Sequence, residues 1–284
     1  MTAPRVLVVG ATNFDIIIRS ERLPGAHEKL RGGDYCAAPG GSAANTAIGL
    51  ARAGCAVRLV SAVGNDLPGR LCLDELRAGG VDVSLVHTDG AHRTGMAVVF
   101  SDSGGKRMMT FAGADRERAL ASVTVDDMAT ADHVHLVGEP SASLARLTDL
   151  ADRAGCTVSV EWNGRDMTPL GPVPALHFMN ADEAARLPGA VAGDPQATAR
   201  QLAVSVGRHV VLTLGARGAL WATPEGALFH EGTRELRPVD RTGGGDAFDA
   251  GVIAAWLHGA SPVTCLRQGL DAASHVIMKI GAHP

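Results

Sequence analysis

Short apolar runs alternate with segments of helical pattern along most of this 284-residue chain. Besides the first run at residues 6–9, the chain has strand-like runs at residues 57–61, 83–86, 134–137, 157–160, 176–179 and 210–214. Helical patterns occupy residues 67–79, 141–154, 181–187, 195–205 and 261–280. This alternation predicts an α/β fold with a mostly parallel sheet flanked by helices on both faces. Without a linker or an internal repeat, we expect a single domain over residues 1–284.

Two regions interrupt the alternation with strand signals alone. Residues 16–18 and 30–38 indicate two short strands joined by a loop, and residues 94–101 and 107–111 indicate a hairpin. We therefore expect a small β-sheet, with strands roughly within residues 14–38 and 94–111. Such a sheet would form a lid that excludes water from a site, or equally a dimer surface.

Gly243, Gly244 and Gly245 lead directly into an apolar helical run that starts at Ala247. A glycine turn before a helix N-terminus favours anion binding, because unpaired amides and the helix dipole add there. Asp246 is a carboxylate at the same place, where a second anion would be repelled. It is better suited to accept a proton from a hydroxyl that attacks a phosphoryl group. The alternative is a capping Asp after a flexible loop.

A second glycine turn precedes a helix that we expect to end at Gly54. Gly40 and Gly41 allow a close approach of backbone to a ligand, and Asn45 lies in the first helical turn. Asn13 and Asp15 follow the first strand, and such loops hold ligands in open α/β sheets. Asp15 has the chemistry to accept hydrogen bonds from two neighbouring sugar hydroxyls, and the alternative is a turn Asn with an exposed Asp.

Polar residues follow four more expected strands, which indicates a site along one rim of the sheet. These residues are Glu139, the segment 161–165, Asn180 with Glu183, and the segment 213–218. Asn180 and Glu183 would share a face of a starting helix, where a carboxylate suits Mg²⁺ held largely through water. The same pair is also typical of a capping box.

Composition and motifs exclude several classes of function. The net charge is −4, which gives no general attraction to nucleic acid or to an anionic membrane. The chain has no signal-peptide core and no apolar run of membrane-spanning length, and its five cysteines lack CxxC spacing. We therefore expect a cytoplasmic protein. P-loop and Rossmann motifs are missing, and His133 and His135 are expected to be ordinary histidines.

The two glycine-to-helix segments resemble the signatures of the ribokinase-like (phosphofructokinase B type) family of carbohydrate and nucleoside kinases. They are residues 40–54 and residues 240–248, and the second is close to the family's D-T-x-G-A-G-D-x-F pattern. The resemblance covers nearly the whole chain, with further landmarks at residues 63–69, 180–183 and 213–218. It implies an ATP-dependent kinase that uses Mg²⁺ and, as in many members, a monovalent cation such as K⁺.

The resemblance also implies roles for single residues. Asp246 would be the catalytic base, with the amides of Gly243, Gly244, Gly245 and Asp246 as the anion hole. The acceptor sugar would be held by Asp15, Gly40, Gly41 and Asn45, and also by Asn13 and Glu139. Phosphates and Mg²⁺ would be organised by Asn180 and Glu183, and the nucleotide by Thr213, Gly215 and Gly218. The monovalent cation would lie beside Asp240, Thr242 and Gly281.

Some positions depart from the family pattern. Arg241 stands where Thr is usual, and the segment 161–165 matches D-x-N-x-R only in part, although Arg165 would still neutralise phosphate charge.

We expect phosphorylation of a primary hydroxyl on a pentose, hexose or ribonucleoside. A nucleoside would use Phe14 or Phe111 for stacking, whereas a sugar phosphate would need the basic residues Lys29, Arg31, Arg93, Lys106 and Arg107. The alternatives are therefore a sugar-phosphate kinase and a non-catalytic sensor on the same scaffold. We expect a homodimer through the lid.

Overall fold

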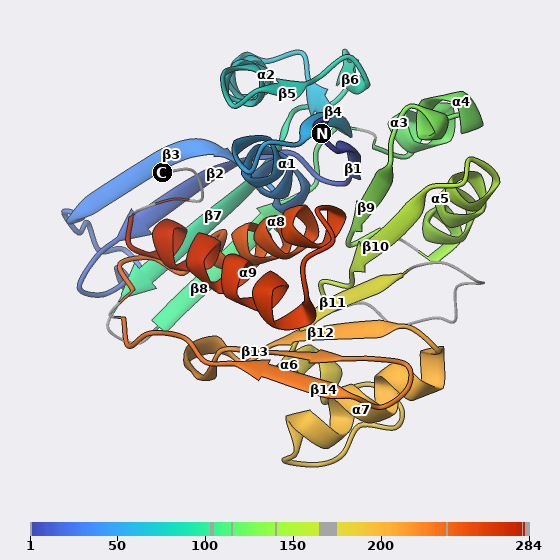
Figure 1. Ribbon diagram of the computed structural model, residues 1–284. Helices are drawn as coiled ribbons and strands as arrows, with labels where there is room; N and C mark the ends of the chain where they lie inside the picture. The colour runs from blue at the N-terminus through green and yellow to red at the C-terminus, as the bar shows by residue number, and fades with distance from the viewer. Residues whose placement is uncertain are drawn as a thin grey trace.

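The computed structural model describes residues 2–102, 105–114, 116–139, 141–164, 175–236, 238–279 and 281. Its larger sheet contains β1 (Arg5–Val9), β4 (Ala56–Gly64), β5 (Val81–Asp82), β6 (Val86–Asp89), β9 (His133–Val137), β10 (Thr157–Glu161), β11 (Leu176–Asn180), β12 (His209–Thr213), β13 (Ala219–Ala222) and β14 (Leu228–Glu231). The strand order is β14-β13-β12-β11-β10-β9-β1-β4-β5, and β6 pairs with β4. All these pairs are parallel except β12–β13 and β13–β14, which form an antiparallel edge (Figure 1). The mostly parallel sheet is therefore confirmed.

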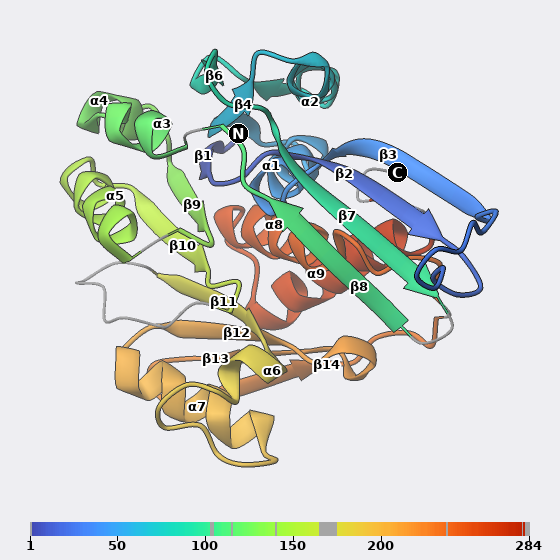
Figure 2. The ribbon, with the colours of Figure 1, turned by 180° about the vertical axis from the view of Figure 1, so that it is seen from behind.

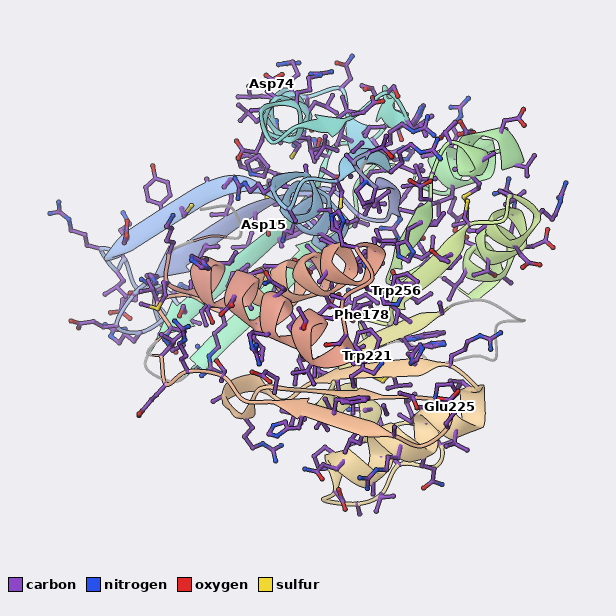
Figure 3. The ribbon with its side chains drawn as sticks, in the orientation of Figure 1. Asp15, Asp74, Phe178, Trp221, Glu225 and Trp256 are labelled. Carbon is purple, nitrogen blue, oxygen red and sulfur yellow. The ribbon has the colours of Figure 1, made fainter. Side chains whose placement is uncertain are left out.

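Helices cover both faces of this sheet, as expected. One layer contains α1 (Ser42–Arg52), α2 (Leu67–Ala78), α8 (Gly244–Leu257) and α9 (Pro262–Ile277), and the other contains α3 (Arg116–Ser122), α4 (Val125–Ala129), α5 (Ser141–Arg153), α6 (Ala181–Ala184) and α7 (Pro195–Val206). Alternate residues of a strand face opposite sides. In β1, Val6 and Val8 pack in the core under α1 and α8, whereas Leu7 and Val9 pack in the core under α5. Phe178 and Trp221 lie beneath α8 and α9 (Figure 3).

A separate small sheet lies beside the larger one (Figure 2). Its strands are β2 (Asn13–Arg19), β3 (Asp34–Gly40), β7 (Gly95–Asp102) and β8 (Gly105–Phe111), in the order β3-β2-β7-β8. The β2–β7 pair is parallel, and the other two pairs are antiparallel. The predicted small sheet is confirmed, although its second strand starts at Asp34 and not near residue 30.

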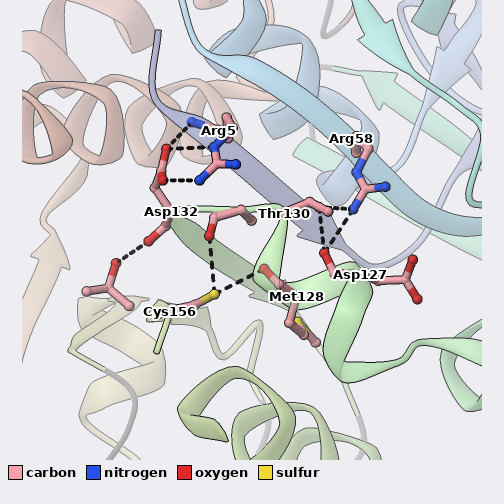
Figure 4. Close-up of polar contacts among 9 residues, drawn as sticks. Arg5, Arg58, Asp127, Met128, Thr130, Asp132 and Cys156 are labelled. Atoms are coloured by element: carbon pink, nitrogen blue, oxygen red, sulfur yellow. Dashed lines mark hydrogen bonds and ion pairs between the residues drawn. The ribbon is translucent and has the colours of Figure 1, made fainter. Parts of the chain in front are cut away.

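Polar bonds tie together the amino ends of the central strands (Figure 4). Asp132, before β9, accepts hydrogen bonds from the main-chain N and Nη2 of Arg5 at 2.8 and 2.7 Å. Arg58 of β4 donates to the carbonyl oxygen of Asp127 at 2.9 Å, and the Cys156 thiol donates to that of Met128 at 3.1 Å. This edge is opposite the strand ends that carry the polar residues noted above. These bonds fix the amino ends of the central strands, and the carboxyl ends of the strands remain available for a site.

Several sequence expectations about elements were wrong. Residues 83–86 do not form one strand, because Ser84 N donates to Asp82 Oδ1 at 2.8 Å and this turn separates β5 from β6. The helix expected at 181–187 ends at Ala184, and the one expected at 261–280 spans Pro262–Ile277. Strands β13 and β14 and helices α3 and α4 had no counterpart in the sequence reading.

Among the described residues, no helix combines the length and the apolar character needed to cross a lipid bilayer.

Candidate active site

The first turn of α8 carries the glycine segment and Asp246. Gly243 is the N-cap residue with φ 75°, a left-handed conformation that favours glycine, and no side chain caps the helix. Asp246 lies in the first helical turn, so it is not the capping residue of the alternative reading. The amides of this turn and the positive end of the helix dipole thus lie beside a carboxylate.

Helix α1 holds Asp246 in place. Asn45 Nδ2 donates to Asp246 Oδ2 at 2.6 Å, and Thr46 Oγ1 donates to the main-chain oxygen of Asp246 at 3.5 Å. Asn45 is 8% exposed, so its amide is fixed by the packing of α1 against α8. The structure therefore brings the two glycine-fed helices together at Asp246, although they are about 200 residues apart in sequence.

A cavity of about 160 Å³, here called the central cavity, lies in front of Asp246. Its lining brings together predicted site residues from three places in the chain, namely Gly245, Asp246, Asn180, Glu183 and Thr213. Asn180 and Thr213 are register partners on β11 and β12, which explains their proximity. Asn180 and Glu183 also form the capping box of α6, since each side chain accepts a 2.9 Å bond from the other's main-chain N–H.

Four carboxyl groups line the central cavity, belonging to Glu161, Glu183, Asp246 and Asp249. Burial, with the nearby charges of Glu183 and Asp246, raises the pKa of Glu161 to about 8, against a lowering hydrogen bond from Asn163 N at 2.8 Å. Burial and the Glu161 charge also raise the pKa of Asp249, which hydrogen-bonds Glu161. The sequence indicated Glu161 only as part of a strand end, and it did not indicate Asp249.

A second cavity of about 580 Å³, here called the lid-side cavity, lies between the small sheet and the larger one. Its lining includes Asn13, Gly95, Met96 and Phe111, as well as Arg116 at the start of α3. Glu139 has no exposed side-chain surface and lies behind Arg116, with Oε1 at 3.3 Å from Arg116 Nε. The sequence did not indicate Arg116, because this residue does not directly follow an expected strand and belongs to no recognised motif.

The other predicted acceptor residues lie close to this cavity. Asp15 packs against Gly40, where an added Cβ would lie 2.2 Å from Asp15 Oδ2, so glycine is needed there. Gly41 is the N-cap residue of α1. Of the described basic residues expected for a sugar phosphate, Lys29, Arg31, Arg93 and Arg107 do not line the cavity. The side chain of Lys106 and the whole of Arg165 lie outside the described part of the chain.

A third cavity of about 390 Å³, here called the α9-side cavity, lies between α9 and the loop after β12. It is lined by Thr213, Gly215, Gly218 and Arg241, together with apolar residues such as Ile277. Thr213 and Gly245 line both this cavity and the central one. Ser42 and Asn163, in turn, line both the central and the lid-side cavities. The three cavities are therefore neighbours, and the central cavity, which Asp246 lines, shares lining residues with each of the other two.

The loop before α8 is held by Asp240. Its Oδ1 accepts from the main-chain N and the hydroxyl of Thr242 at 3.0 and 2.8 Å, and its Oδ2 accepts from Gly281 N at 3.1 Å. The three residues expected at a monovalent cation site are thus assembled. Within the described ranges, no group of three or more His, Cys, Asp or Glu side chains is arranged to hold a metal ion directly.

Comparisons with known proteins show what the whole chain is similar to. A family model described as "pfkB family carbohydrate kinase" matches residues 3–284. The ATP-dependent ribose-1-phosphate kinase of Halopiger xanaduensis is 32% identical over 260 residues, which cover 89% of this chain and 85% of that protein.

Solved structures give the same result. Arabidopsis thaliana ribokinase in complex with ribose and ATP superposes with a TM-score of 0.84 and 26% identity, covering 99% of this chain and 94% of that chain. The adenosine kinase of Sinorhizobium meliloti superposes with a TM-score of 0.86 and 25% identity, covering 100% and 96%.

Proposed function

The chain belongs to the pfkB family of carbohydrate kinases, and we propose that it transfers the γ-phosphate of ATP to a primary hydroxyl of a sugar or sugar-containing small molecule. That it is an ATP-dependent carbohydrate or nucleoside kinase follows from its relatives. The observation that carries the proposed reaction is that the central cavity shares lining residues with both of the other cavities. An acceptor in the lid-side cavity and a nucleotide in the α9-side cavity would meet in the central cavity, beside Asp246.

In this proposal Asp246 takes the proton of the acceptor hydroxyl while the hydroxyl oxygen attacks the γ-phosphorus and ADP leaves. The main-chain amides of residues 243–246 and the dipole of α8 stabilise the charge on the transferring phosphoryl group. The Asn45 hydrogen bond fixes the direction of the carboxylate. Much of the rate then comes from positioning, because a carboxylate is a modest base.

Binding roles are assigned by cavity. Asn13, with Asp15, Gly40, Gly41 and Asn45 close by, would hold the acceptor, and Glu139 would contribute through Arg116. Thr213, Gly215 and Gly218 would hold the nucleotide, and Asn180 its phosphates. The small sheet would act as a lid, because Met96 and Phe111 of this sheet line the acceptor cavity.

The residues present fit a hydrated Mg²⁺ ion. Glu183 uses only Oε2 in the capping box, and the Asp246 carboxylate lines the same cavity, which suits a hard cation that keeps several waters. Glu183 would hold Mg²⁺ through water, and the ion would neutralise charge on the phosphates. Asp240, Thr242 and Gly281 would support a monovalent cation such as K⁺, since hydrogen bonds to the Asp240 carboxylate hold the three residues together and a carboxylate oxygen suits a hard cation.

A homodimer through the lid is also part of the proposal. Register partners place Ala37, Ile16, Val98 and Met109 in one row across the four strands of the small sheet. The adjacent row on the same face is Pro39, Phe14, Met96 and Phe111. Phe111 and Met109 are 50% and 55% exposed. A continuous apolar face of this kind marks an interaction surface, and the same face of a second copy is its matching partner.

The experiment that tests the function is an ADP-release screen with the purified full chain. The acceptors are ribose, fructose and adenosine as neutral compounds, and ribose 1-phosphate and gluconate as anionic ones, each with and without Mg²⁺ and K⁺. We expect Mg²⁺-dependent ADP release with at least one acceptor, and a phosphorylated product at its primary hydroxyl. ATP binding without transfer to any acceptor would instead favour the sensor alternative.

A further inference from the structure

Arg116 gives the lid-side cavity a cationic wall. The other described residues that line this cavity are neutral: they are small residues such as Gly95 and Ala112, polar residues such as Asn13, and the apolar Met96 and Phe111. Arg116 is the first residue of α3, and its side chain lies beside Glu139, which follows the end of β9. A charge in an otherwise neutral binding cavity needs a reason, because a neutral sugar is recognised well by uncharged donors and acceptors.

The ion pair with Glu139 gives this charge a direction. Glu139 is 0% exposed at its side chain, whereas the Arg116 side chain is 28% exposed and lines the cavity. The pair is therefore a dipole with its negative end in the protein and its positive end toward the cavity. Arg116 Nε is the nitrogen nearest to Glu139, and a guanidinium carries four further N–H donors at its terminal nitrogens. Those donors match the geometry of a phosphate or a carboxylate.

We propose that Arg116 is a specificity-determining residue that binds an anionic group of the acceptor, a phosphate or a carboxylate, with Glu139 as its positioning residue. This inference rests on the proposed function and names its substrate class. The acceptor is then a sugar phosphate or a sugar acid whose primary hydroxyl faces Asp246 through the region lined by Ser42 and Asn163.

A nucleoside is the main competing acceptor. Phe111 and Met96 offer an apolar surface in the same cavity, on which a base would stack. A neutral base would leave the Arg116 terminus without a charged partner, and a cation facing such a ligand gains little from it. The cavity therefore favours the anionic acceptor, and adenosine is the decisive comparison.

The test measures kcat and KM for ribose 1-phosphate, gluconate, ribose and adenosine with the wild-type chain and two variants, Arg116→Gln and Arg116→Lys. We expect the wild type to have its highest kcat/KM with an anionic acceptor. Arg116→Gln should raise the ratio of the anionic KM to the ribose KM by roughly 10- to 100-fold, as expected for loss of a hydrogen bond to a charged group. Arg116→Lys should restore part of that ratio, because the charge remains and the planar fork is lost.

Two further variants separate recognition from folding. Arg118→Gln changes an exposed arginine two residues away on α3 and should leave the ratio unchanged. Arg116→Gln combined with Glu139→Gln also removes the charge of the buried Glu139 side chain, and it should show the same raised ratio with a higher thermal stability than Arg116→Gln alone. Whichever of ribose 1-phosphate and gluconate has the higher kcat/KM identifies the anion as a phosphate or as a carboxylate.

The inference would be overturned if the wild type had its highest kcat/KM with ribose or adenosine, or if Arg116→Gln left the KM ratio unchanged. Either result would leave the proposed kinase function standing. Failure of the wild type to release ADP with every acceptor would count against the proposed function itself. In that case calorimetric titration of ribose 1-phosphate still tests the site. Equal affinity of the wild type and Arg116→Gln for this probe would refute the role of Arg116.

Discussion

At the scale of a single residue, Asp246 lies in the first turn of α8 and accepts a 2.6 Å hydrogen bond from the side chain of Asn45. An Asn at this position keeps an oxygen to accept that bond, so the fold should be preserved while the base is lost. We predict that Asp246→Asn lowers kcat by roughly 10²- to 10⁴-fold, with a much smaller effect on KM. Steady-state kinetics with the preferred acceptor measure this effect. The matched control is Asp152→Asn, which changes an exposed aspartate and should keep the wild-type kcat.

Turnover by Asp246→Asn within a few-fold of the wild type would remove Asp246 from the reaction. The family assignment would stand, because it depends on the whole chain.

The raised pKa of Glu161 leads to a prediction about how the stability of the protein depends on pH. Its pKa is raised to about 8 in the folded protein, so between roughly pH 4.5 and 8 the folded state binds a proton that the unfolded state does not. The stability from this group is therefore fully present below pH 4.5 and is lost as the pH rises through about 8. Glu161→Gln mimics the protonated acid toward Asp249. We predict that its Tm advantage over the wild type grows between pH 5 and 8, as measured by thermal unfolding.

The exposed Glu117→Gln is the matched control, and its Tm difference from the wild type should not change with pH. A Glu161→Gln curve parallel to that of the wild type would show that Glu161 is ionised throughout this range.

At the scale of an element, β9 and β10 share a buried polar ladder. His133 bonds Thr157 Oγ1 and Ser159 Oγ at 2.8 Å each, and His135 bonds Ser159 Oγ at 2.7 Å. Both histidines are 0% exposed, and burial lowers the pKa of each to about 3. These hydrogen bonds give both imidazole rings polar partners within the sheet.

Because these two folded-state pKa values lie below the unfolded value near 6.5, the unfolded state binds more protons between about pH 3 and 6.5. Stability is therefore present above pH 6.5 and is lost as the pH falls toward 3, by up to about 1.4 kcal/mol per pH unit for each histidine. We predict that urea unfolding of His133→Gln shows a flatter acid dependence than that of the wild type, despite lower stability at pH 7. An exposed control, His258→Gln, should keep the wild-type slope. An unchanged slope in His133→Gln would show that His133 does not cause the acid loss.

The elements that the sequence predicted well are those with a strong local signal. Buried strands such as β1 and β9, and the glycine-fed helices α1 and α8, combine apolar runs with clear turn residues. Short elements were missed, because α3 and α4 span seven and five residues and β13 and β14 span four each, which is too short for a clear hydrophobic period. Side-chain partners needed the tertiary structure: nothing local to Asp249 or Arg116 reveals Glu161 or Glu139.

At the scale of the whole molecule, the small sheet presents an apolar face whose rows include Met109 and Phe111. Phe111 also lines the lid-side cavity, so dimerisation and acceptor binding would be linked through the same strand. If two copies pack through this face, a charge in its centre is costly, because it would be buried without a partner. A loss of ~2 kcal/mol or more corresponds to roughly 30-fold weaker dimerisation.

Met109 and Met108 provide a matched pair for this test. They are neighbours on β8 with similar exposures of 55% and 60%, yet successive strand residues point to opposite faces. We predict that the wild type and Met108→Asp are dimers by light scattering after size-exclusion chromatography, whereas Met109→Asp is a monomer with a raised KM for the acceptor. The raised KM follows because the partner's lid would no longer support β8 over the cavity. A monomeric wild type, or equal dissociation of both variants, would place the dimer contact elsewhere or remove it.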